Sequence, residues 1–108
     1  TALEIEARHI NVGGVCHGGV ILWLADVVMG VATFEAGDRH PCATIEMDCH
    51  FIAAAKKGDL LFGRSTQLRQ VRGLSFMECE LWSAGRQVAR ASGIWKDLDS
   101  RKPGAGGP

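Results

Sequence analysis

The stretch "HGGVILWLADVVMGVATF", His17 to Phe34, decides the fold because it is long, apolar and helical in pattern. Between Val20 and Phe34 its one charged residue is Asp26. Burying an unpaired carboxylate is costly, so this acid is expected to have a partner outside the helix. We expect the helix to run from about His17 to Glu35, because "AGDRHP" then supplies a glycine cap and a proline that cannot continue it.

Outward from this helix, the pattern predicts strands separated by turns. Leu3–Ile10 alternates in part and suits a strand, and Asn11–Gly14 is a loop by its asparagine and glycines. After the helix, strands are expected over residues 43–51, 60–71, 74–82 and 88–98, with tight turns at 72–73 and 83–87. One long helix followed by consecutive antiparallel strands predicts an α+β layer fold.

The segment "ATIEMDCHF" alternates between apolar and polar residues and therefore predicts a strand with one buried face. The apolar set is Ala43, Ile45, Met47, Cys49 and Phe51, and the polar set is Thr44, Glu46, Asp48 and His50. Strict alternation puts Thr44 on the solvated face. It also puts Cys42 and Cys49, an odd number of positions apart, on opposite faces.

Length and composition indicate one domain, residues 1–98, followed by a Gly/Pro-rich tail, 99–108, that is expected to be disordered. Twelve basic residues balance twelve acidic ones, which gives no reason to expect nucleic acid or an anionic membrane surface. The apolar run is interrupted by Asp26 and is short for a membrane span, so we expect a buried helix. The four cysteines show neither C-x-x-C nor metal-ligand spacing, so free thiols, no metal and a cytoplasmic location without a signal peptide are expected.

The pattern Asn11-x5-His17-Gly18-Gly19-x6-Asp26, followed by Thr44 and "KKGD", resembles the hotdog-fold acyl-CoA thioesterases. The most similar branch is the phenylacetic-acid-degradation type, within the 4-hydroxybenzoyl-CoA thioesterase superfamily, and the resemblance covers Ile10–Lys96. It implies an antiparallel sheet wrapped around a central helix and a homo-oligomer, most simply a dimer of dimers. It also implies no cofactor, because coenzyme A is part of the substrate.

The resemblance also implies catalytic roles. Asp26 matches the acid that attacks the thioester carbonyl or activates water. Gly18 matches the residue whose backbone N–H, at the helix N-terminus, polarises that carbonyl. Asn11 matches a positioning residue and Thr44 one that holds the nucleophile. In the family, the acid and the helix N-terminus of one site come from two subunits.

Elementary chemistry supports some of these roles independently. A helix N-terminus presents unpaired N–H groups and partial positive charge, and Gly18 and Gly19 have no side chains to block a ligand. The alternative is that these glycines only permit tight packing. Asp26 lies more than two turns into the helix and cannot cap it. His17 is a candidate general base, although its distance from Asp26 favours ordering the loop or capping the helix.

Basic residues at strand ends are either solvated loop charge or a site for the phosphates of coenzyme A. The family places coenzyme A over the hairpin at Arg72, with backbone contacts from Gly73 and Leu74. We assign Arg72, Gly73, Leu74, Lys57 and Gly19 to substrate binding. Trp23, Met29 and Phe34 are candidate lining residues of the acyl pocket.

These observations favour an acyl-CoA thioesterase acting on a small aromatic or medium-chain acyl group. Two alternatives stay open on the same fold. One is a hydratase or dehydratase of acyl thioesters, which resembles a different motif. The other is a module that binds acyl-CoA without turnover, which has no need for a buried acid.

Overall fold

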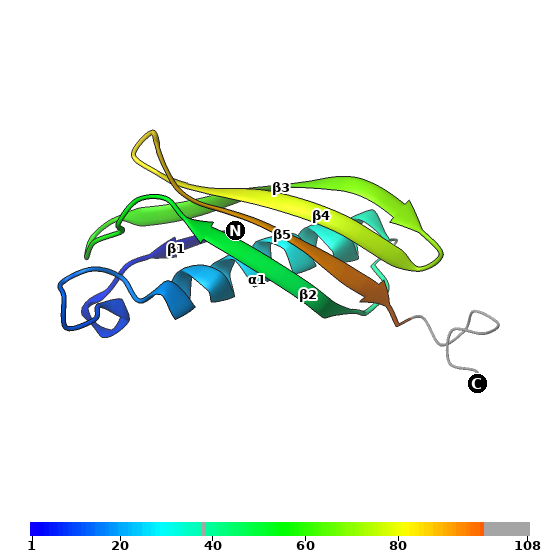
Figure 1. Ribbon diagram of the computed structural model, residues 1–108, viewed down its shortest axis with the longest axis horizontal. Coiled ribbons are helices and arrows are strands. Elements are labelled where there is room, and N and C mark those ends of the chain that lie inside the picture. The colour runs from blue at the N-terminus through cyan, green and yellow to red at the C-terminus, as the bar shows by residue number, and fades with distance from the viewer. Residues whose placement is uncertain (38, 99–108) are drawn as a thin grey trace.

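The computed structural model describes residues 1–37 and 39–98, and its centre is the helix α1 (Gly18–Ala36). The sheet that packs against it has five antiparallel strands in the order β1-β3-β4-β5-β2 (Figure 1). The strands are β1 (Ala2–Glu4), β2 (Cys42–Phe51), β3 (Leu60–Val71), β4 (Leu74–Ser83) and β5 (Arg86–Asp97). The expected α+β class is confirmed, whereas the expected disordered tail lies outside the described residues.

The N-terminal segment differs from the single strand predicted over Leu3–Ile10. Strand β1 is short, and a 3-10 helix, η1 (Ala7–His9), follows it. The Glu6 N–H donates to His9 Nδ1 at 2.9 Å, and the His9 N–H donates to the Glu6 carbonyl at 2.9 Å. These local hydrogen bonds turn the backbone away from the sheet, which is how polar side chains compete with strand pairing.

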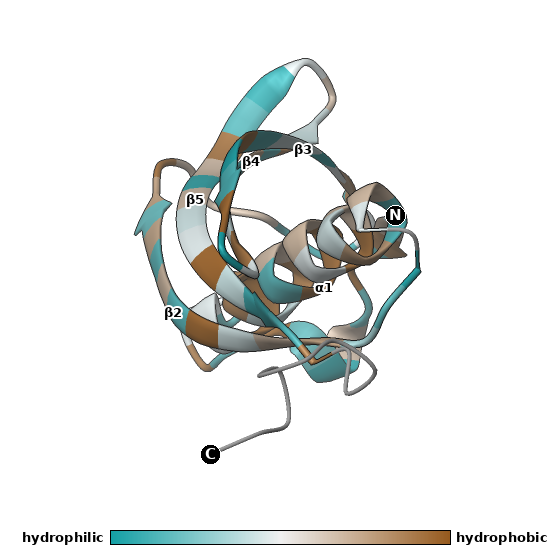
Figure 2. Ribbon diagram, turned by 90° about the vertical axis from the view of Figure 1, so that its right-hand side faces the viewer, coloured by the Kyte–Doolittle hydropathy of each residue, from teal (hydrophilic) through white to brown (hydrophobic). Residues whose placement is uncertain are grey.

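One face of α1 forms the core with the concave side of the sheet, which curls around the helix in Figure 2. The buried helix residues recur every three or four positions: Ile21, Leu24, Ala25, Val28, Met29 and Thr33. The helix approaches β3 closely at Gly63, where a Cβ would lie 2.6 Å from Val28 Cγ2. The prediction of a buried helix is therefore right for this face.

The other flank of α1 is apolar and uncovered in the single chain. Trp23 and Val31 are 55% and 48% exposed, and Leu22 is exposed beside them. By length and hydropathy α1 could also cross a membrane, so the view that it is too short was wrong. Length and hydropathy therefore do not characterise α1 on their own. One of its faces packs on the sheet, and its other flank is apolar and has no neighbour among the described residues.

Strand β2 is an edge strand, and a bulge interrupts its pairing with β5 between Thr44 and Glu46. Ile45 is the extra residue and is 54% exposed. An extra residue reverses the alternation on one side of the bulge. The predicted inward facing is right for Met47 and Cys49, which pack against the core. It is wrong before the bulge, where Cys42 packs against the core as well and Thr44 turns toward α1.

Candidate functional site

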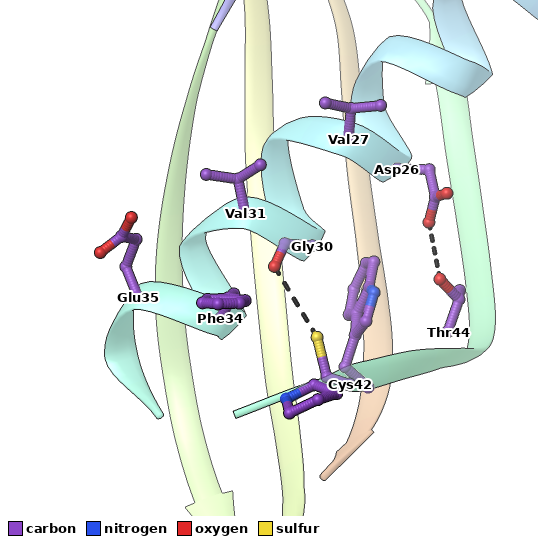
Figure 3. A pocket seen from close by; sticks show the side chains of 10 residues that line it. Asp26, Val27, Gly30, Val31, Phe34, Glu35, Cys42 and Thr44 are labelled. Atoms are coloured by element: carbon purple, nitrogen blue, oxygen red, sulfur yellow. Dashed lines mark hydrogen bonds between the residues drawn. The ribbon is translucent and has the colours of Figure 1, made fainter. Parts of the chain in front are cut away.

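Asp26 and Thr44 form the centre of the candidate site. The Thr44 hydroxyl donates to Asp26 Oδ1 at 2.7 Å, linking the middle of α1 to the start of β2 (Figure 3). The carboxylate is half-buried. The partner that was expected outside the helix is the hydroxyl of Thr44 and not a basic side chain. One oxygen of the acid is fixed by the hydroxyl, and the other remains available for a ligand or a water.

Two hollows open on either side of this pair. The larger, about 620 Å³, extends toward the C-terminal end of α1, and Asp26 and Thr44 lie at its edge. Its other lining residues are Val27, Gly30, Val31, Phe34, Glu35, Pro41, Cys42 and Trp95, most of which are labelled in Figure 3. The smaller, about 370 Å³, is lined by Asp26, Thr44, Gly19, Leu22, Trp23 and Met47. Asp26 therefore lies between the two hollows. A long ligand that occupied both hollows would place its middle beside this carboxylate.

The lining of the larger hollow was only partly foreseen. Phe34 lines it and Trp23 lines the smaller hollow, but Met29 is fully buried and lines neither, so that expectation was wrong. Trp95 and Cys42 were missed. Trp95 reaches the hollow because it pairs opposite Thr44 across β2 and β5. The sequence does not reveal this strand register, so it held no signal for Trp95.

The N-terminus of α1 is a separate feature. No described residue accepts a hydrogen bond from the N–H of Gly18 or Gly19, and both residues are exposed. Gly18 borders a third hollow of about 310 Å³, where a Cβ would meet the Phe51 ring at 3.5 Å. Eight residues at 1.5 Å each separate Gly18 from Asp26 by about 12 Å. One chain therefore does not bring the acid and its own helix start together.

Asn11 and His17 hold the loop before α1 in place. Asn11 Oδ1 accepts from the N–H of Gly13 at 2.8 Å and of Val15 at 3.3 Å, which is the behaviour of a turn residue. The expectation that the His17 ring caps the helix is wrong, because it makes no capping hydrogen bond. His17 orders the loop through its backbone instead, since its N–H donates to the His9 carbonyl at 2.8 Å.

The residues assigned to coenzyme A lie at both ends of the molecule. The hairpin with Arg72 and Gly73 packs near the end of β5, where the Asp97 N–H donates to the Gly73 carbonyl at 2.8 Å. Leu74 begins β4 beside it. Lys57 is in the β2–β3 loop, which lies with the helix N-terminus at the opposite end (Figure 1). Arg72 and Lys57 of one chain therefore do not form one phosphate site.

The thiols near the site are poorly suited to nucleophilic attack. Burial raises the pKa of the Cys42 thiol, and the nearby carboxylates of Asp97 and Asp26 raise it further. All four cysteines are free. Within residues 1–37 and 39–98, no cluster of His, Cys, Asp and Glu side chains could hold a metal ion. The carboxylate of Asp26 remains the candidate reacting group at this site.

Comparison with known families and relatives shows which proteins this chain is similar to. A family model described as the thioesterase superfamily matches residues 13–90. A candidate esterase of Pseudomonas aeruginosa is 35% identical over 95 residues, which make up 87% of this chain and 71% of that protein. Candidate esterases of Archaeoglobus fulgidus and Caenorhabditis elegans are 29% and 27% identical, but the matched residues span only 42% and 46% of their own lengths.

Solved structures share the same architecture. A conserved protein of Pseudomonas aeruginosa is 30% identical with a TM-score of 0.84, and the match covers 90% of this chain and 78% of that one. A mutant of a phenylacetic acid degradation protein from Thermus thermophilus is 25% identical with a TM-score of 0.83, covering 90% and 82%. One long helix against a curled five-stranded sheet confirms the hotdog fold expected from the motif.

Proposed function

The chain belongs to the thioesterase superfamily, and from this premise we propose that it is an acyl-CoA thioesterase releasing a free acid and coenzyme A. Membership supports acyl-thioester hydrolysis in general. The finer proposal is that the acyl group is small and aromatic or of medium length. The apolar hollow of about 620 Å³ beside Asp26 supports it, because its lining includes Val27, Val31 and Phe34.

The observation that carries this proposal is the carboxylate of Asp26, held by Thr44 at the edge of that hollow. Asp26 either attacks the thioester carbon, giving an anhydride that water cleaves, or takes a proton from a water that attacks directly. In both cases the carbon–sulfur bond breaks, the acyl group gains the hydroxyl of water to become the free carboxylic acid, and the departing thiolate of coenzyme A gains the proton. Thr44 orients the carboxylate so that its second oxygen faces the ligand.

The carbonyl oxygen needs a donor as it gains negative charge. In this proposal the donor is the N–H of Gly18 from a second copy of the chain, because Gly18 of the same chain is about 12 Å from Asp26. The exposed apolar flank of α1 and the free edge of β2 support a shared site of this kind.

Coenzyme A as the carrier is also part of the proposal. A hypothetical thioesterase of Streptococcus pneumoniae, 22% identical, was solved with coenzyme A and shares the fold with a TM-score of 0.83. At that identity the likeness concerns the fold alone. The choice of carrier for this chain is tested by the assay below.

The test is release of free thiol from a panel of acyl-CoAs by the wild-type protein and by Asp26→Asn. We expect hydrolysis of at least one small aromatic or medium-chain member, and a loss of about 10²-fold or more in kcat for the variant. The amide keeps the shape of the side chain and removes its charge. Retained folding and assembly, checked by circular dichroism and light scattering, assign the loss to chemistry.

Asp48→Asn is a matched control. Asp48 also accepts a hydroxyl hydrogen bond across two elements, from Ser92 at 3.0 Å, but it is exposed on β2 away from both hollows beside Asp26. It should keep wild-type turnover. Near-wild-type turnover by Asp26→Asn would show that the acid is structural. Binding without thiol release by the wild-type protein would favour a binding module, and hydration of an enoyl thioester would favour a hydratase.

A further inference from the structure

Trp95 is a buried side chain in the larger hollow that the proposed chemistry does not use. It is 2% exposed, lies on β5 directly opposite Thr44, and lines the hollow. A Cβ added at Gly30 would stand 3.5 Å from its indole Nε1. Gly30 also lines the hollow, so the absence of a side chain at this position leaves the N–H uncovered.

The indole N–H of Trp95 has no acceptor among the residues that the structure describes. Among the described residues, one side-chain nitrogen is both unpaired and sealed from solvent, and it is Gln87 Nε2, not Trp95 Nε1. Trp95 Nε1 is therefore not sealed. Because Trp95 and Gly30 both line the larger hollow and Nε1 lies beside Gly30, we take its remaining exposure to open into that hollow. By contrast, Trp82 Nε1 donates to Glu80 Oε2 at 3.0 Å.

A ligand that fills the hollow decides what happens to this donor. A purely alkyl group would displace water from the N–H and leave it unpaired, which costs free energy. A group with an oxygen acceptor at this place would pair with it instead. An unpaired donor in a site therefore discriminates against ligands that cannot satisfy it.

The position of the donor limits where the acceptor must be. Gly30 follows Asp26 by four residues, so the two positions lie on one face of α1, about 6 Å or roughly one turn apart along the axis. The N–H beside Gly30 thus meets the acyl group several bonds beyond the carbon that Asp26 acts on.

We propose that the preferred acyl group carries a hydrogen-bond acceptor, a carbonyl or similar oxygen, about one helical turn from the thioester carbon, and that Trp95 recognises it. This inference rests on the proposed thioesterase function. Trp95 is then a specificity-determining residue. The ligand reaches its N–H because Gly30 has no side chain to cover it.

The test compares hexanoyl-CoA with 5-oxohexanoyl-CoA, whose ketone is four carbons beyond the thioester carbon. We expect kcat/KM to favour the ketone by about 3- to 10-fold, the range of one net neutral hydrogen bond. Trp95→Phe should remove or reverse this preference, since the ketone would then enter the hollow without a partner. Trp82→Phe is the matched control and should keep it, because its N–H is already paired within the protein.

Gly30→Ala tests the same contact with Trp95 intact. Its methyl group would sit in ordinary contact with Nε1, so the chain should fold while the N–H is covered from the hollow. The preference should fall toward that of Trp95→Phe. A preference that persists in both Trp95→Phe and Gly30→Ala, or that is absent from the wild-type protein, would overturn the inference.

A second readout does not depend on turnover. In nitrogen-15 NMR of the wild-type protein, the indole resonance of Trp95, assigned by its absence from Trp95→Phe, should move on addition of 5-oxohexanoate more than with hexanoate. If no thioester is hydrolysed, the proposed function fails and this titration alone decides. An equal or absent response to the two acids would then count against recognition by Trp95.

Discussion

At the scale of single residues, Thr44 shows how one contact defines the site. Its hydroxyl is the hydrogen-bond donor that the structure gives to Asp26. We expect Thr44→Val to lower kcat about 10-fold with little change in KM, because the acid loses its orientation while the shape is kept. Thr44→Ser retains the hydroxyl and should restore most of the activity. A Thr44→Ser variant as slow as Thr44→Val would point to lost packing rather than a lost hydrogen bond.

Cys79 lets the core be tested by pH. Burial, with a smaller contribution from Cys49, raises its pKa from 9.0 to about 11. The unfolded chain loses this proton at lower pH than the folded chain, so stability falls as the pH rises from 9 to 11. Two pKa units correspond to about 2.7 kcal/mol. Urea unfolding should show the wild-type protein losing roughly 2 kcal/mol more than Cys79→Ala over this range, whereas parallel losses would contradict the assignment.

At the scale of elements, the helix and the hairpins were predictable from the sequence, whereas details of the two edge strands of the sheet, β1 and β2, were not. The apolar run of α1, the turn at Arg72 and Gly73, and the turn before β5 all follow from local chemistry, and both residues of the first turn have positive φ. The first strand was predicted too long and η1 was missed, because a hydrogen bond between Glu6 and His9 redirects the chain. The side-chain facing at the start of β2 was missed because nothing in "ATIEMDCHF" marks Ile45 as an extra residue.

The same limit applies to the candidate site. The acid and the glycines of the motif were recognisable, since their spacing along one helix is visible in the sequence. Thr44 faces Asp26 because it pairs opposite Trp95, and the extra residue Ile45 hides this facing from the alternation of the sequence. The facing is a result of strand pairing at long range, which alternation alone does not specify.

The β3–β4 hairpin carries a prediction of its own. Arg72 is exposed at its tip, and its proposed contact with coenzyme A is remote from the reacting carbonyl. Arg72→Ala should raise KM about 2- to 5-fold at unchanged kcat, because an exposed charge pair contributes about 1 kcal/mol or less. Arg8→Ala, which alters another exposed arginine, should change neither value. An unchanged KM in Arg72→Ala would leave the arginine as ordinary surface charge.

At the scale of the whole molecule, the single chain leaves apolar surface uncovered around the site. Trp23, Val31 and Ile45 expose large apolar side chains around the site, and β2 presents an unpaired edge. We expect light scattering to give the mass of a homo-oligomer, most simply a dimer of dimers. Trp23→Glu, on the uncovered flank of α1, should reduce that mass and lower turnover together. A monomeric mass for the fully active wild-type protein would exclude the shared site.

The bulge in β2 also decides how this strand can change in length during evolution. Ile45 has no partner of its own on β5, because Thr44 pairs with Trp95 and Glu46 pairs with the next residue, Ile94. Deleting the codon for Ile45 would join two stretches that already keep regular register, so no side chain would change face. Deletion within either regular stretch would instead turn part of the strand over. A lineage can therefore shorten β2 by one residue at Ile45 and keep the hydroxyl of Thr44 beside the acid.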